Sequence, residues 1–173
     1  NEFALIDGIL DLGVFTLQTD AITDSGFSDT KYIIADANAG GQLVYNDIGS
    51  TTTTLPIGTA TFYTPLEIEN TLPSAFTASV KYINEPGEFA APVPSPDYIQ
   101  LQWEITRALD GEATVKFSWP ATLDAENLTR VGRYEVPTWD DAGTSVNFVD
   151  ETVTVSGISQ FSSFAIFGDK SAT

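Results

Sequence analysis

The fold is decided by the stretch YIQLQWEIT, residues 98–106, in which apolar and polar side chains alternate. This alternation predicts a β-strand with one buried face. Working outward from it, we expect further strands at residues 62–68, 75–83, 113–119, 130–136, 152–155 and 161–167. Residues 85–96 hold four prolines. They are expected to form a loop, because proline cannot donate to a central strand ladder.

Strands at this spacing, with no helical periodicity between them, predict an all-β protein. We expect an Ig-like antiparallel β-sandwich over residues 59–169, followed by a polar linker at residues 170–173. Ahead of the sandwich, residues 1–58 form short apolar pieces separated by glycines. Such pieces predict solenoid-like or hairpin strands packed on the main domain. Within them, residues 31–35 and 42–45 flank a Gly/Asn-rich turn, which is typical of a hairpin.

The residue types that the chain lacks limit its chemistry. Its 173 residues include no Cys and no His, which excludes thiolate nucleophiles, Ser–His–Asp arrangements and the usual zinc sites. Hydrolysis of a glycosidic bond by two carboxylates needs no His, and Glu67, Glu69 and Glu104 are the candidates for it. The sequence around them gives no sign of a cleft, so we expect no catalytic residues and no enzymatic activity.

The charge of the chain disfavours two classes of partner. Seven basic and 24 acidic residues give a net charge of −17, which repels phosphate backbones and anionic lipids. No apolar run approaches the roughly 20 residues that cross a bilayer. We therefore expect no binding to nucleic acid and no insertion into a membrane.

Aromatic side chains supply the candidate ligand-binding residues. Trp139 lies in a segment rich in Pro, Asp and Gly, and with Tyr134 it could present an exposed platform on which a sugar stacks. Trp103 and Trp119 alternate with apolar neighbours, which favours the core for both.

Acidic side chains supply the candidate cation site. Asp140 and Asp141 lie beside a glycine, with Asp150 a little further on. If these three carboxylates converge across a hairpin, their oxygens suit Ca²⁺. Two solvated acidic turns on a strongly acidic protein remain the alternative, and no other cofactor is expected.

Short motifs stand in a fixed order along nearly the whole chain. They are GILDLG (8–13), FTL (15–17), KYIIAD (31–36), LPIGT (55–59), YTPLEIEN (63–70), LQWEI (101–105), VKFSW (115–119), RY (133–134), the tryptophan at 139 and VTVSGISQFSSFAI (153–166). In this order they resemble repetitive secreted and cell-surface proteins of Bacteroidota-type bacteria. The resemblance implies β-solenoid rungs ahead of a C-terminal Ig-like β-sandwich, in an exported protein delivered by type IX secretion. It transfers no catalytic residues.

The expected function is therefore that of a non-catalytic, extracellular structural module or adhesin at the bacterial cell surface. Its expected partners are other copies of itself, neighbouring domains of the same protein and surface glycans. Self-association is expected at the N-terminal strands, through Leu10, Leu12, Phe15 and Leu17, because exposed strand edges can pair by strand addition and so build a filament. The alternative is a carbohydrate-binding module of a secreted hydrolase.

Overall fold

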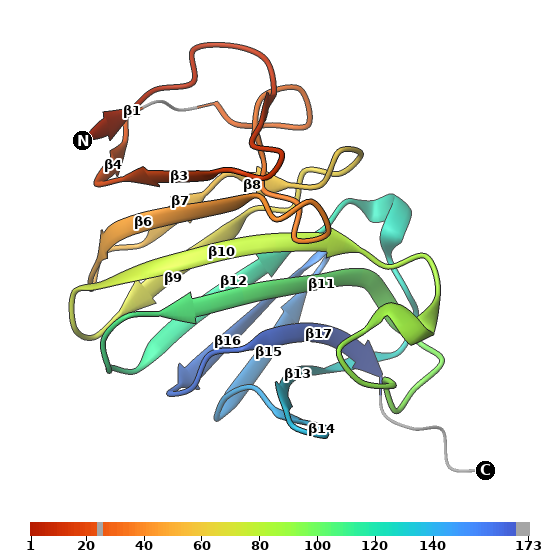
Figure 1. Ribbon diagram of the computed structural model, residues 1–173. Coiled ribbons are helices and arrows are strands. Elements are labelled where there is room, and N and C mark those ends of the chain that lie inside the picture. Colours follow the sequence, from red (N-terminus) through yellow and green to blue (C-terminus); the bar gives the residue numbers. More distant parts are fainter. Residues whose placement is uncertain (24–25, 169–173) are drawn as a thin grey trace.

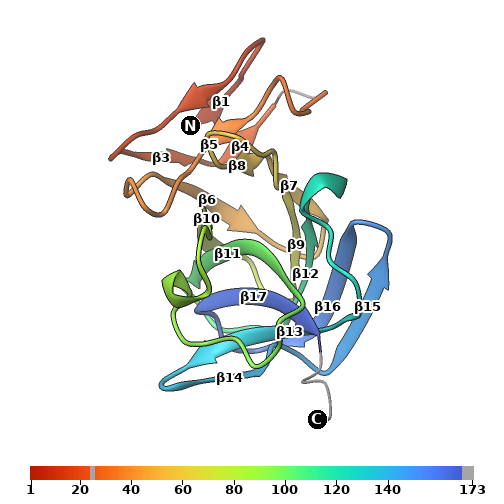
Figure 2. The same ribbon diagram turned by 90° about the vertical axis from the view of Figure 1, so that its right-hand side faces the viewer.

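The computed structural model describes residues 1–23 and 26–168, so the linker expected at residues 170–173 lies outside the described residues. Two large sheets face each other (Figures 1 and 2). In spatial order the first contains β14 (Thr138–Asp141), β13 (Leu128–Glu135), β17 (Ser163–Gly168), β11 (Tyr98–Arg107), β10 (Ser74–Tyr82), β6 (Gln42–Ile48) and β3 (Thr16–Thr19). The second contains β15 (Ser145–Val149), β16 (Thr152–Ile158), β12 (Ala113–Ser118), β9 (Leu66–Asn70) and β7 (Thr53–Leu55).

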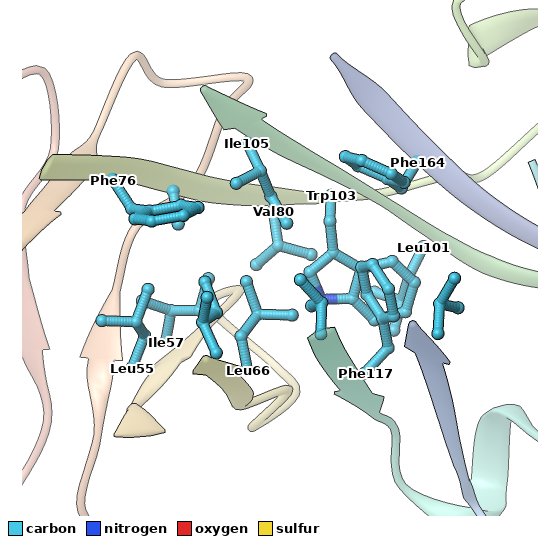
Figure 3. Close-up of a cluster of buried hydrophobic side chains, with 14 of the residues drawn as sticks. Leu55, Ile57, Leu66, Phe76, Val80, Leu101, Trp103, Ile105, Phe117 and Phe164 are labelled. Carbon is cyan, nitrogen blue, oxygen red and sulfur yellow. The ribbon is translucent and has the colours of Figure 1, made fainter. Parts of the chain in front are cut away.

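The space between these sheets is filled by the side chains that the alternating pattern predicts. Trp103 of β11 is fully buried, and its ring packs edge-on against Phe117 of β12 with centroids 5.2 Å apart. Phe117 in turn contacts Phe164 of β17 at 5.6 Å (Figure 3). From Leu66 onward the paired strands of both sheets run antiparallel. The predicted all-β fold with an antiparallel β-sandwich is thus confirmed.

The strands of the first 58 residues pair in parallel among themselves, whereas β6 and β7 pair antiparallel with β10 and β9 of the sandwich. β1 (Glu2–Phe3) pairs with β4 (Ala21–Ile22), and β3 pairs with β6. A three-stranded sheet has the order β2 (Leu10–Asp11), β5 (Ile33–Ile34) and β8 (Ile57–Gly58). In it Leu10 lies opposite Ile33, and Ile33 lies opposite Ile57. The chain thus makes a first pass through β1, β2 and β3 and a second pass through β4, β5 and β6. These successive passes lie one above another at the top of Figure 1.

The hairpin expected at residues 31–45 is wrong. β5 lies between β2 and β8, whereas β6 lies between β3 and β10 in the seven-stranded sheet. The turn between them is a corner: the Asp36 carbonyl accepts hydrogen bonds from the amides of Ala39, Gly40 and Gly41. Gly40 has a φ of 92°, a conformation that glycine adopts without strain. The Gly/Asn-rich turn therefore redirects the chain into another sheet instead of folding it back on itself.

The parallel stack and the sandwich share one hydrophobic core. Leu12, Ile33 and Ile57 belong to the same cluster of buried side chains as Trp103 and Phe117. Burial of apolar surface is the main favourable term in folding, so this continuous core joins the two parts. At their junction the buried Tyr32 hydroxyl donates to the carbonyl oxygen of Thr59 at 2.9 Å.

The proline-rich segment is a loop, as the sequence predicts. It holds the 3₁₀ turn η1 (Pro86–Glu88) and joins the neighbouring strands β10 and β11. A second 3₁₀ turn, η2 (Ala121–Leu123), follows β12. Over residues 1–23 and 26–168, no helix is long and apolar enough to cross a membrane.

Candidate functional site

The aromatic platform predicted from Trp139 does not lie on the surface. Trp139 is only 9 % exposed, and its indole N–H donates to the Ala91 carbonyl at 2.9 Å. Phe89 and Phe167 pack edge-on against it at 6.3 and 6.2 Å. Tyr134 is half-buried, 5.7 Å from the same ring. The expected exposure of Trp139 is therefore wrong.

The proline-rich loop explains this burial. It lies over the outer face of the seven-stranded sheet and, with that face, forms a second hydrophobic cluster of Ile83, Phe89, Ala91, Trp139, Ala165 and Phe167. Gly132 of β13 leaves space for the Phe167 ring of this cluster, since a Cβ at position 132 would stand 2.6 Å from that ring. The sequence contains one sign of this burial. The loop carries apolar residues among its prolines, and these residues need a surface to cover.

The three carboxylates predicted to bind Ca²⁺ are separated between two sheets. Asp140 and Asp141 lie in β14 of the seven-stranded sheet, and Asp150 lies in the turn between β15 and β16 of the other. Asp141 is already engaged, because its carboxylate accepts from the Arg130 guanidinium at 2.6 and 3.0 Å. Within the described residues no group of three acidic side chains could hold a metal ion.

Of the three carboxylates considered for glycoside hydrolysis, Glu67 and Glu69 share one strand and Glu104 lies in the other sheet. Glu67 lies in β9 and forms an ion pair with Lys116 at 2.7 Å. Glu69, two residues further along the same strand, accepts a hydrogen bond from the Thr52 hydroxyl. Glu104 lies in β11 of the opposite sheet.

The four residues predicted for self-association differ in their exposure: one is buried, two are partly buried and one is exposed. Leu12 is buried and faces the core, so its predicted place at a contact surface is wrong. Leu10 and Leu17 are partly buried and pack against the same core. Phe15 is 74 % exposed, as such a contact needs.

The structure adds three exposed apolar side chains to Phe15. Val14, Ile6 and Ile9 are exposed by 72, 86 and 46 %. The strands of this pass, β1, β2 and β3, each have a neighbour on one side only. We call these three free strand edges, with Ile6, Ile9, Val14 and Phe15, the open coil face. It lies at the top of Figures 1 and 2.

A further free edge lies on the opposite side of the sandwich. β15 is the last strand of the five-stranded sheet, and its Val146 and Val149 are exposed. The strand SVNFV carries neither charge nor proline, the two usual means of protecting an edge from strand addition. The other outer strand nearby, β14, carries Asp140 and Asp141.

A groove of about 660 Å³ opens beside the free edge of β7. Among the described residues, its lining consists of Ile22, Gly26, Phe27, Tyr45, Thr51, Thr52, Thr53, Thr54 and Tyr63. Tyr63 also lines a second hollow of about 510 Å³ with Phe62, Pro65 and Trp119. Its ring rests against Tyr32, with centroids 5.5 Å apart. Tyr63 therefore belongs to the lining of both hollows.

Comparisons with known proteins add no relative. No family model, no curated protein and no solved structure matches this chain. Function must therefore be argued from the surfaces just described.

The groove gives a prediction on alkaline stability. Burial, and secondarily the negative charge of Glu67, raise the pKa of Tyr63 from 10.0 to about 12. The unfolded chain therefore loses this proton first as the pH rises, so the contribution of Tyr63 is complete below pH 10 and is lost between about 10 and 12. Because Tyr63 is partly exposed and solvent screens its charge, the free energy of unfolding should fall over this range by about 1 kcal/mol.

Urea unfolding at a series of pH values measures this loss. Tyr63→Phe should reduce the dependence of the unfolding free energy on pH. An identical dependence in Tyr63→Phe and the native chain would refute the assignment to Tyr63.

Proposed function

We propose that this chain is a non-catalytic structural or adhesive module of a bacterial cell-surface protein, and that it binds a second copy of itself through the open coil face. One observation carries the proposal. Four exposed apolar side chains and three unpaired strand edges lie together on the first pass of the chain. Unpaired edges beside apolar side chains are a ready template for another strand. The surface location rests on the sequence resemblance.

A second copy is the occupant that this geometry favours. On the other side of the stack β6 continues into the sandwich by pairing with β10, so within the described residues that side does not present a set of three free edges to match the open coil face. Identical edges can instead pair antiparallel about a two-fold axis, which brings the same patch of both copies together. The open coil face by itself therefore gives a closed dimer.

A filament requires a second contact on each copy. The uncharged free edge of β15 is the candidate, because it lies at the opposite end of its sheet from β7. Dimers joined through the two β15 edges would form a continuous chain. Val146→Lys should prevent such polymers and leave the dimer intact, since an edge lysine opposes strand addition.

The proposal predicts the effect of removing the exposed apolar groups. The double variant Val14→Ser and Phe15→Ser should weaken dimerisation by at least about a hundredfold, because each of the two side chains contributes about 1.5–3 kcal/mol when it is buried. Sedimentation velocity over a range of protein concentrations measures this change. Leu109→Ser removes an equally exposed apolar side chain elsewhere (63 % exposed) and should have no effect. A native chain that stays monomeric at high concentration would contradict the proposal.

A further inference from the structure

We infer that the groove beside β7 is a binding site for a neutral glycan chain, a function beyond the proposed self-association. Its nine described lining residues are uncharged, although the protein as a whole has a net charge of −17. The overall charge repels anionic ligands at long range, and the nine described lining residues give an ionic ligand no ion-pair partner. A ligand without charge fits this electrostatic setting.

The hydroxyl groups of the lining suit a polyhydroxylated ligand. Thr52 donates to Glu69, and Thr53 donates to the Thr51 carbonyl at 3.3 Å. The hydroxyls of Thr51, Thr54, Tyr45 and Tyr63 make no hydrogen bond with any residue that the structure describes. Each can both donate and accept, which is what sugar hydroxyls require.

The aromatic rings of the lining suit the apolar faces of a sugar. Tyr45 and Tyr63 are both partly exposed, so their rings combine a flat apolar surface with a polar end. The Lys31 Nζ lies over the Phe27 ring, 5.5 Å from its centroid. Less of the Phe27 ring is therefore open to a ligand. Tyr45 and Tyr63 are therefore the expected stacking residues.

The size and shape of the groove favour a chain over a single sugar. Its volume of about 660 Å³ lies in the range of about 300–1,000 Å³ typical of small-ligand sites. Tyr63 also lines the second hollow, in which Trp119 and Pro65 add apolar surface and Asp29 adds a carboxylate. A linear oligosaccharide can occupy the first hollow and extend past Tyr63 into the second.

Affinity electrophoresis tests the inference. The purified chain is run in native gels containing laminarin, mannan, xylan or dextran as neutral polysaccharides, or alginate as an anionic one. We expect at least one neutral polysaccharide to retard the protein, and alginate not to. Tyr45→Ala and Tyr63→Ala should each weaken that retardation at least about tenfold, with Tyr98→Ala as the matched control, since Tyr98 is also partly exposed and lines neither hollow.

Two further variants distinguish a loss of binding from a loss of folding. Thr54→Val and Tyr45→Phe remove a hydroxyl without changing the shape of the side chain, and each should weaken the retardation with an unchanged circular dichroism spectrum. No retardation by any neutral polysaccharide would overturn the inference, as would retardation that all the groove variants retain. Binding of a synthetic alternating Thr-Val peptide without binding of any polysaccharide would instead show that the free edge of β7 adds a strand. Because the site is separate from the open coil face, dimerisation is unaffected by either result.

Discussion

Trp103→Ala is expected to destabilise the protein by about 3–5 kcal/mol, the usual cost of removing a buried aromatic side chain. For a chain of this length the loss corresponds to a fall in Tm of roughly 6–20 °C. The reason is its position: Trp103 is fully buried between the sheets and packs against Phe117 at 5.2 Å. Thermal unfolding followed by far-ultraviolet circular dichroism measures the effect.

Trp103→Phe is the matched control for this variant. The indole N–H of Trp103 has no hydrogen-bond partner within the described residues, and an unpaired buried donor is itself costly. Phenylalanine removes that donor and keeps most of the apolar volume, so the phenylalanine variant should lose less than half of what alanine loses. Equal losses in the two variants would show that the aromatic contact with Phe117 does not dominate.

Gly58→Ala is expected to destabilise the protein by about 1–3 kcal/mol or more, because the site has no room for a methyl group. A Cβ at this position would stand 2.3 Å from the Phe62 carbonyl oxygen and 2.7 Å from the Tyr32 ring. Since β8 packs into the same core as the sandwich, the tryptophan fluorescence of the sandwich should report the change as one transition at a lower denaturant concentration.

Gly49→Ala provides the comparison for Gly58→Ala. A Cβ at Gly49 would meet only the Pro73 ring, at an ordinary contact distance of 3.8 Å. This variant should therefore unfold at nearly the denaturant concentration of the native chain. A Gly58→Ala protein as stable as Gly49→Ala would contradict the close packing of the parallel stack on the sandwich.

The long central strands could be predicted because their alternation is set by burial on one face. Residues 98–106 were expected as a strand, and the structure has β11 at Tyr98–Arg107. β14 and β15 were missed. Asp140 and Asp141 beside a glycine are typical of a turn, yet an outer strand tolerates charge because one of its edges faces solvent. Local sequence does not show which strand will be the last in its sheet.

The second limit on prediction is that the pairing partner of a strand can lie far away along the chain. Residues 31–35 and 42–45 have the local pattern of a hairpin, and only the strands provided by the first pass of the chain place them in different sheets. The same limit applies to the candidate sites. Phe15 could be selected from its sequence context, but the groove joins Tyr45 and Tyr63 from separate segments, and Trp139 is buried by a loop some 45 residues before it.

The most direct test of the central claim asks where two copies meet. The chain has no native Cys, so a single spin label can be attached at Asp7→Cys beside the open coil face, or at Asp140→Cys on β14 at the other end of the seven-stranded sheet. Dipolar electron resonance should detect a defined distance between copies labelled at position 7, and none between Val14→Ser, Phe15→Ser copies carrying the same label. Coupling only between labels at position 140, or coupling at neither position, would contradict association through the open coil face.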